Sequence, residues 1–113
     1  MQRSIGSQYF RDGNRYWSVP RLIFLAKDLK VFSIPMQGFN SYNIAPKTTD
    51  TVDFVMHIDL VINADMQYPI ILDQEGYVMD GRHRILHAML NKHKTIKAVR
   101  FDKTPDCCYT KED

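Results

Sequence analysis

The sequence predicts an α+β domain in which a small mixed β-sheet packs against about three helices. Two observations carry this prediction. Apolar residues recur at helical spacing in three segments, and the segments between them are rich in β-branched and aromatic residues, in the order helix, strand, helix, hairpin, helix, strand. A chain of 113 residues with 44% hydrophobic and 25% charged residues is long and apolar enough for one packed domain.

The two ends of the chain are predicted to lie outside the packed domain. Residues 1–16 are polar, with scattered glycine and no sustained period, and they predict an irregular N-terminal arm. The domain itself is expected over residues 17–106. Residues 107–113 are expected to form a polar C-terminal tail that frays.

A first helix is predicted from Ser18 to about Lys30. Ser18 is a suitable N-cap, and Pro20 is tolerated in the first turn of a helix. Residues 31–36 then have the composition of a short strand. Because Pro35 cannot donate a hydrogen bond to a neighbouring strand, we expect this strand to lie at an edge or to end there.

A long loop separates this strand from the second helix. Residues 38–49 have no clear period, and loops of this length often carry binding contacts, although no residue here identifies a ligand. The second helix is predicted to begin at Asp50, whose carboxylate can cap its first turn. We interpret His57 on this helix as an ordinary, partly buried or surface histidine. The predicted apolar face comprises Val52, Val55, Met56, Ile58, Val61 and Ile62.

The last third of the chain has the clearest local pattern. Residues 68–72 and 77–79 predict a hairpin, joined by turn-forming residues at 73–76. A third helix is predicted over 82–91, and a half-buried strand over 95–101. The expected apolar face of the third helix comprises Ile85, Leu86, Met89 and Leu90.

Net charge and hydropathy exclude few classes of binding partner. A formal net charge of +2 is well short of the strongly basic balance that would indicate nucleic-acid binding by itself. No apolar stretch approaches the length needed to cross a bilayer, and the polar start lacks the apolar core of a secretory signal. We therefore expect a cytoplasmic protein with no membrane partner. Cys107 and Cys108 are adjacent, a spacing typical of ordinary thiols.

The candidate binding site is the loop from Asp80 to Arg84, at the start of the third predicted helix. Unpaired N–H groups and the peptide dipoles favour an anion at such a helix end, and Gly81 permits close approach to the backbone. Arg82, His83 and Arg84 add cationic hydrogen-bond donors, so the sequence predicts a phosphate site. The alternative is that the arginines are solvated and the histidine packs locally.

Two acidic residues near this loop have structural and functional interpretations. Asp80 is expected to be the N-cap of the third helix, and its functional alternative is to hold Mg²⁺ beside a phosphate or to orient an arginine. Glu75 is expected to be a solvated residue of the hairpin turn. Its functional alternative follows from the resemblance described next.

Several motifs in this region resemble the core of the ParB/sulfiredoxin-like superfamily, and in particular short bacterial ParB-like partition proteins. The residues concerned are Pro69 to Leu72, Asp73 to Gly76, Met79 to Arg84, and Ala88. The similarity extends over about Trp17 to Asp106, and its specific part is Ile70 to Phe101. The resemblance implies the same small α+β fold.

The resemblance also implies roles for individual residues. In ParB-type domains a Gly-x-x-Arg turn contacts nucleotide phosphates, and Gly81 and Arg84 match that turn. In sulfiredoxins a Gly-Cys-His-Arg loop holds ATP phosphates, and His83 and Arg84 match its last two positions. Arg82 stands where the sulfiredoxin cysteine would be, so we do not expect sulfiredoxin activity. Kinases of the superfamily use acidic residues near the nucleotide, which makes Glu75 a candidate general base.

These considerations lead to a nucleoside triphosphate-binding domain, with Mg²⁺ and ATP or CTP as expected ligands and hydrolysis or phosphoryl transfer as a further expectation. No DNA-binding helix-turn-helix follows the predicted fold, so ParB-type clamping on DNA is not expected. The alternative is a nucleic-acid- or protein-binding module that uses the same cationic loop. In that alternative, Lys92, Lys94 and Lys97 extend the patch. Nuclease activity is less favoured, because no carboxylate or histidine cluster suggests a metal site.

Overall fold

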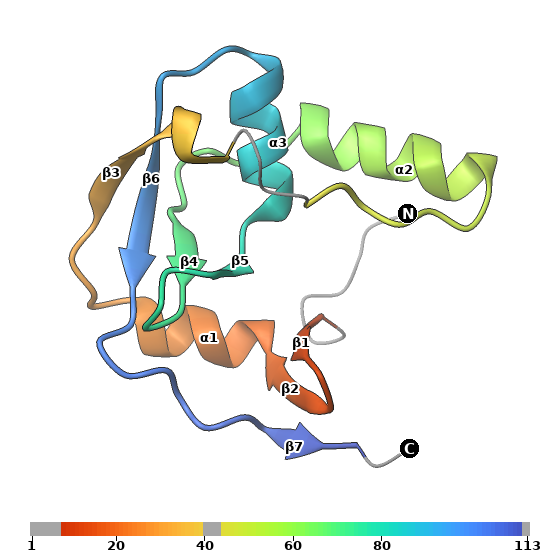
Figure 1. Cartoon of the computed structure of the whole chain (residues 1–113). Coiled ribbons are helices and arrows are strands. Elements are labelled where there is room, and N and C mark those ends of the chain that lie inside the picture. Colours follow the sequence, from red (N-terminus) through yellow and green to blue (C-terminus); the bar gives the residue numbers. More distant parts are fainter. Residues whose placement is uncertain (1–7, 40–43, 112–113) are drawn as a thin grey trace. The chain divides into compact units, whose positions relative to one another are not determined.

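The computed structural model, which describes residues 8–39 and 44–111, has an α+β fold (Figure 1). The described residues form a three-stranded sheet of order β1-β2-β7 and a four-stranded sheet of order β3-β6-β4-β5. The elements are β1 (Tyr9–Asp12), β2 (Arg15–Ser18), α1 (Val19–Ala26), β3 (Phe32–Pro35), the 3₁₀-helix η2 (Met36–Phe39), α2 (Thr51–Ile62), β4 (Ile70–Leu72), β5 (Val78–Asp80), α3 (Arg82–Leu90), β6 (Thr95–Arg100) and β7 (Tyr109–Thr110).

The chain divides into two compact units, each built from segments that are distant in sequence. The first unit contains residues 1–30, 71–80 and 99–113, and the second contains residues 31–70 and 81–98. The α+β prediction is confirmed.

In the described residues no helix is both long and apolar enough to span a bilayer.

The first unit contains a β-hairpin where the sequence predicts an irregular arm. β1 and β2 pair antiparallel across a two-residue turn at Gly13 and Asn14, and Gly13 has a φ of 63°. β7 pairs antiparallel with β2, with Arg15 opposite Thr110. The expected irregular lead-in is therefore wrong for residues 9–16, and the expected fraying is wrong for residues 109–110. Both errors arise because the polar stretch is stabilised by strand pairing rather than by an apolar period of its own.

An aromatic and aliphatic core holds the first unit together. Its buried members are Trp17, Leu22, Ala26, Ile71, Met79, Val99 and Phe101. The indole Nε1 of Trp17 donates a hydrogen bond to the Pro105 carbonyl at 2.8 Å, so the one polar atom of this side chain is satisfied. Ser18 is the N-cap of α1, as predicted, and its Oγ accepts from the Arg21 N–H. α1 ends at Ala26, before the predicted Lys30.

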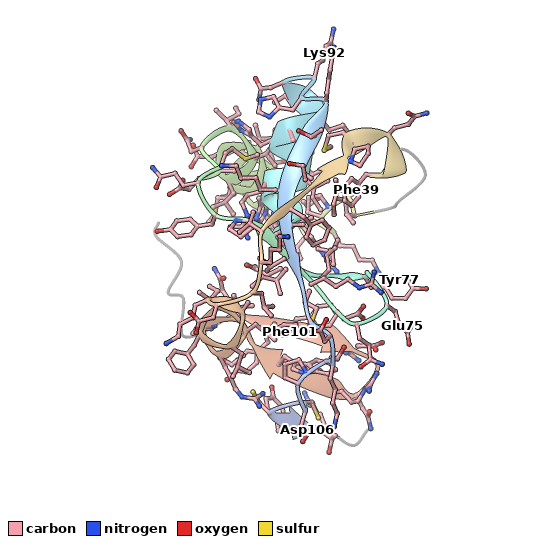
Figure 2. All side chains as sticks on the ribbon, turned by 90° about the vertical axis from the view of Figure 1, so that its left-hand side faces the viewer. Phe39, Glu75, Tyr77, Lys92, Phe101 and Asp106 are labelled. Carbon is pink, nitrogen blue, oxygen red and sulfur yellow. The ribbon has the colours of Figure 1, made fainter. Side chains whose placement is uncertain are left out.

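The predicted hairpin is confirmed as β4 and β5, which pair antiparallel. The Asp73 carboxylate accepts hydrogen bonds from the backbone N–H groups of Glu75 and Tyr77, each at 2.9 Å, and Gly76 has a φ of 91°. The side chains of Glu75 and Tyr77 extend outward at this turn (Figure 2). Turn chemistry within five residues is thus enough to set this hairpin.

In the second unit, β3 pairs antiparallel with β6, with Phe32 opposite Ala98 and Pro35 opposite Thr95. The prediction that Pro35 lies at a strand end is confirmed, since it is the last residue of β3, which is an edge strand. The predicted loop of residues 38–49 begins within η2, whose Phe39 side chain is buried. Residues 40–43 of that loop lie outside the described residues.

α2 begins where the sequence predicts, but its burial differs. The Asp50 carboxylate accepts a hydrogen bond from the Asp53 N–H at 2.9 Å, so the predicted N-cap is confirmed. None of the twelve residues of α2 is buried. The predicted apolar face is therefore largely uncovered in this structure. α2 packs against α3, yet Val52, Val55, Ile58 and Ile62 all remain exposed.

α3 confirms the third predicted helix and buries only part of the predicted face. Ile85 and Ala88 are buried, whereas Met89 and Leu90, near the end of the helix, are exposed. The helix closes through Lys92, whose φ of 57° is left-handed. The next N–H, from His93, reaches back to the Ala88 carbonyl at 2.9 Å. Lys92 extends outward at this end of the unit (Figure 2).

Candidate functional site

The candidate site is the start of α3, where the helix begins at a glycine. Gly81 is the N-cap residue in a left-handed conformation, with a φ of 114°, and no side chain caps the first turn. The prediction that Asp80 is the N-cap is therefore wrong. Asp80 is the last residue of β5 and pairs with Ile71 in the hairpin. The turn from strand to helix requires a positive φ, which glycine adopts without strain and aspartate does not.

Gly81 is also required by packing. A Cβ atom at this position would lie 2.5 Å from Ile70 Cγ2 and 3.1 Å from Arg84 Nη2. The sequence predicts that Gly81 lets a ligand approach the backbone closely. In the structure, side chains of the same unit occupy that space beside Gly81. The guanidinium of Arg84 folds back over the glycine, so a ligand would meet this arginine at the loop.

Cationic side chains fill the first turn of α3 and no acidic residue lies in it. Arg82 is exposed, whereas His83 and Arg84 are half-buried. Asp80, His83 and Arg84 each take part in interactions within the chain. A bound anion would have to replace some of these interactions or be added to them. Positive charge at a helix N-terminus opposes the helix dipole, and a bound anion would reverse that unfavourable interaction.

The structure brings His57 of α2 to His83 of α3, a pairing that the sequence analysis missed. His57 Nδ1 and His83 Nε2 lie 3.2 Å apart, and the two rings are stacked with centroids 5.5 Å apart. Twenty-six residues separate the two histidines. No local pattern connects residues on two different helices, so only the packing of α2 on α3 reveals the pair.

A carboxylate lies beside this pair of histidines. Asp53 Oδ1 lies 3.6 Å from His57 Nε2. A carboxylate at that distance favours the tautomer of His57 that carries its proton on Nε2, which leaves Nδ1 as a hydrogen-bond acceptor. With that tautomer of His57, His83 would be the donor, from Nε2 to His57 Nδ1. We infer the order Asp53, His57, His83, which ends on the first turn of α3.

The other two histidines also lie on or beside α3. His87 Nδ1 donates to the Val61 carbonyl at 2.8 Å, because a carbonyl oxygen can only accept. The His87 and His93 rings meet edge to face, with centroids 6.0 Å apart. In residues 8–39 and 44–111, no group of three or more His, Cys, Asp or Glu residues is arranged to hold a metal ion. His57, His83 and His87 are contacts between α2 and α3.

The candidate residues are divided between the two units. Gly81, Arg82, His83 and Arg84 belong to the second unit, whereas Glu75 and Asp80 belong to the first. Glu75 is an exposed turn residue, as its structural interpretation predicts. Its role as a general base stays a prediction.

Comparison of the chain with protein-family models, with curated proteins and with solved structures finds no match.

Proposed function

We propose that this protein binds the phosphates of a nucleoside triphosphate at the start of α3. The observation that carries the proposal is the first turn itself, which begins at Gly81 without a side-chain cap, contains no acidic residue and has three cationic or titratable side chains in succession. Backbone N–H groups and guanidinium groups together are the usual donors to phosphate oxygens. Arg82 is the exposed donor of this set.

Nucleoside triphosphates enter such sites with Mg²⁺. Mg²⁺ is commonly held by one or two carboxylates together with phosphate oxygens and water. Asp80 directly precedes Gly81 in sequence and is the carboxylate we propose for this role. Hydrolysis or phosphoryl transfer, with Glu75 as the general base, is the corresponding catalytic proposal.

Isothermal titration calorimetry with ATP, CTP and GTP, with and without Mg²⁺, tests the proposal. Arg82→Gln removes the exposed donor and leaves the buried contacts of the loop intact. A charge-assisted hydrogen bond contributes about 1.5–3 kcal/mol, so we expect affinity to fall by at least about tenfold. Lys47→Gln is the matched control, because Lys47 is an exposed cation of the same unit and is not part of the loop sequence. It should bind like the wild type.

Equal weak binding by the wild type and both variants would reject the nucleotide site. The alternative, binding of a nucleic acid through the loop and Lys92, Lys94 and Lys97, gives a different result. Affinity for an oligonucleotide would then fall steeply with salt and would not respond to free nucleotide. Release of inorganic phosphate, measured on the wild type and on Glu75→Gln, separates turnover from binding alone.

A further inference from the structure

The outer face of α2 is an exposed apolar surface. The face comprises Val52, Phe54, Val55, Ile58 and Ile62, whose exposed fractions are 69%, 54%, 55%, 42% and 56%. At 3.6 residues per turn, Val52, Val55 and Ile62 lie roughly opposite His57, which faces α3, whereas Phe54 and Ile58 lie on the flank of the helix between the two sides. A helix that is apolar on all sides is normally covered, and a large exposed apolar patch usually marks an interaction site.

The charge around this face restricts what can cover it. No lysine or arginine occurs between Thr48 and Gly81, although the whole chain has 15. In the second unit the same stretch contains Asp50, Asp53, Asp59 and Asp65. A second α2 would bring like charges together, and an anionic lipid surface or a nucleic acid would be repelled as well. The complementary surface is therefore apolar and basic.

The end of α3 has this complementary composition. Leu90 and Met89 are exposed by 62% and 41%. Lys92 and Lys94 follow within four residues and are also exposed. The left-handed backbone at Lys92 turns the chain at the helix end, where this lysine extends outward (Figure 2).

We propose that the chain associates with itself head to tail, with the outer face of α2 in one copy covered by the Leu90–Lys94 end of α3 in the next. Such an interface is heterologous, so it leaves one unused surface at each end and permits further growth. The apolar side chains on both sides would be removed from water, and the aspartates and lysines would set the orientation. Two exposed apolar residues on one side make this a small interface, typical of weak association.

Two surface variants test the two halves of the interface. Val55→Ser/Ile62→Ser removes apolar surface from α2. Leu90→Ser/Lys94→Ser removes an apolar side chain and a positive charge from the α3 end. All four positions are exposed, so circular dichroism should show folded proteins. Tyr77→Ser is the control, because Tyr77 is another exposed large hydrophobic residue but belongs to the β4–β5 turn.

Sedimentation velocity over a range of concentrations is the measurement. For the wild type and Tyr77→Ser we expect the average mass to rise with concentration beyond that of a dimer, and to rise less at high salt. Each interface variant alone should remain monomeric. An equimolar mixture of the two should form a dimer and grow no further, since one intact surface remains on each protein.

Three results would overturn the proposal. One is a wild-type protein that is monomeric at every concentration. Another is self-association that is lost in the α2 variant but kept in the α3-end variant, which would indicate α2 pairing with α2. The last is the absence of a dimer in the mixture.

Discussion

Helices α1 and α2 begin in the same way, but they differ in how much of their surface is buried. Each begins one residue after a side-chain cap, Ser18 for α1 and Asp50 for α2. α1 buries Val19, Leu22 and Ala26, whereas α2 buries no residue at all. The comparison teaches that a cap determines where a helix starts, and that the surrounding chain determines whether its apolar residues are covered.

The largest loss of stability is expected for a substitution in α1 at the core of the first unit. Leu22 is fully buried, so Leu22→Ala should lower the free energy of unfolding by about 2–5 kcal/mol through lost burial and the cavity left behind. Urea unfolding followed by tryptophan fluorescence measures this, because Trp17 lies in the same core. A loss below about 1 kcal/mol would show that the core of this unit contributes little to stability.

α3 offers a second kind of helix start, which depends on glycine rather than on a side-chain cap. Gly81→Ala forces a left-handed residue to carry a Cβ against Ile70, and we expect a loss of roughly 1–3 kcal/mol. Thermal unfolding is the measurement. Gly38→Ala is the control, because an added Cβ there meets no atom within 4 Å. Similar losses for both variants would contradict the packing argument.

The two caps should be equivalent in spite of the different surroundings of their helices. Ser18→Ala and Asp50→Ala each remove one acceptor from the first turn, at 3.4 and 2.9 Å respectively. Each should lower stability by about 1 kcal/mol. Chemical denaturation measures the loss of stability in both variants. Ser18→Asp keeps an acceptor at the cap of α1, so it should lose much less stability than Ser18→Ala. A loss confined to α1 would mean that α2 is held mainly by its contacts with α3.

Replacement of valine by serine should affect stability differently in the two helices. Val55 is exposed on α2, so Val55→Ser should change stability by no more than about 0.5 kcal/mol when the protein is dilute. Val19→Ser, at a buried position of α1, is the matched comparison and should be clearly destabilising. Equal effects, measured by denaturation of both proteins at low concentration, would show that α2 is covered even in the monomer.

One smaller feature of the first unit responds to pH. Desolvation, followed by the neighbouring Tyr9, Tyr16 and Cys108, raises the pKa of Tyr109 above its ordinary value. The neutral phenol is therefore favoured in the folded chain. The contribution of the neutral phenol to stability should be present at neutral pH and be lost as the pH rises through the pKa of the folded state.

Much of the local structure could be predicted because its causes lie within a few residues. Ser18 and Asp50 cap helices, Asp73 closes a turn, and Pro35 ends a strand, each through contacts with near neighbours in sequence. The hairpin of β1 and β2 was missed although its signal was present. Gly13 and Asn14 stand between two aromatic pairs, Tyr9 with Phe10 and Tyr16 with Trp17, which is the composition of a two-residue hairpin.

The candidate site was predicted in part. The glycine at the start of α3, and the arginines and histidine that follow it, were located from the sequence. The N-cap role of Asp80 was wrong, because strand pairing holds this residue in β5 and Gly81 is the cap. The contact of His57 with His83 could not be predicted, because a spacing of 26 residues has no meaning until two helices pack together.

The sequence by itself determined the helix starts, the β4–β5 turn, the cation-free stretch around α2 and the cationic first turn of α3, because capping, turn geometry and charge depend on neighbouring residues. Only the tertiary structure decided which apolar faces are covered, that β7 completes a sheet with β2, and that His57 meets His83. Those features depend on segments far apart in the chain, whose meeting is set by packing.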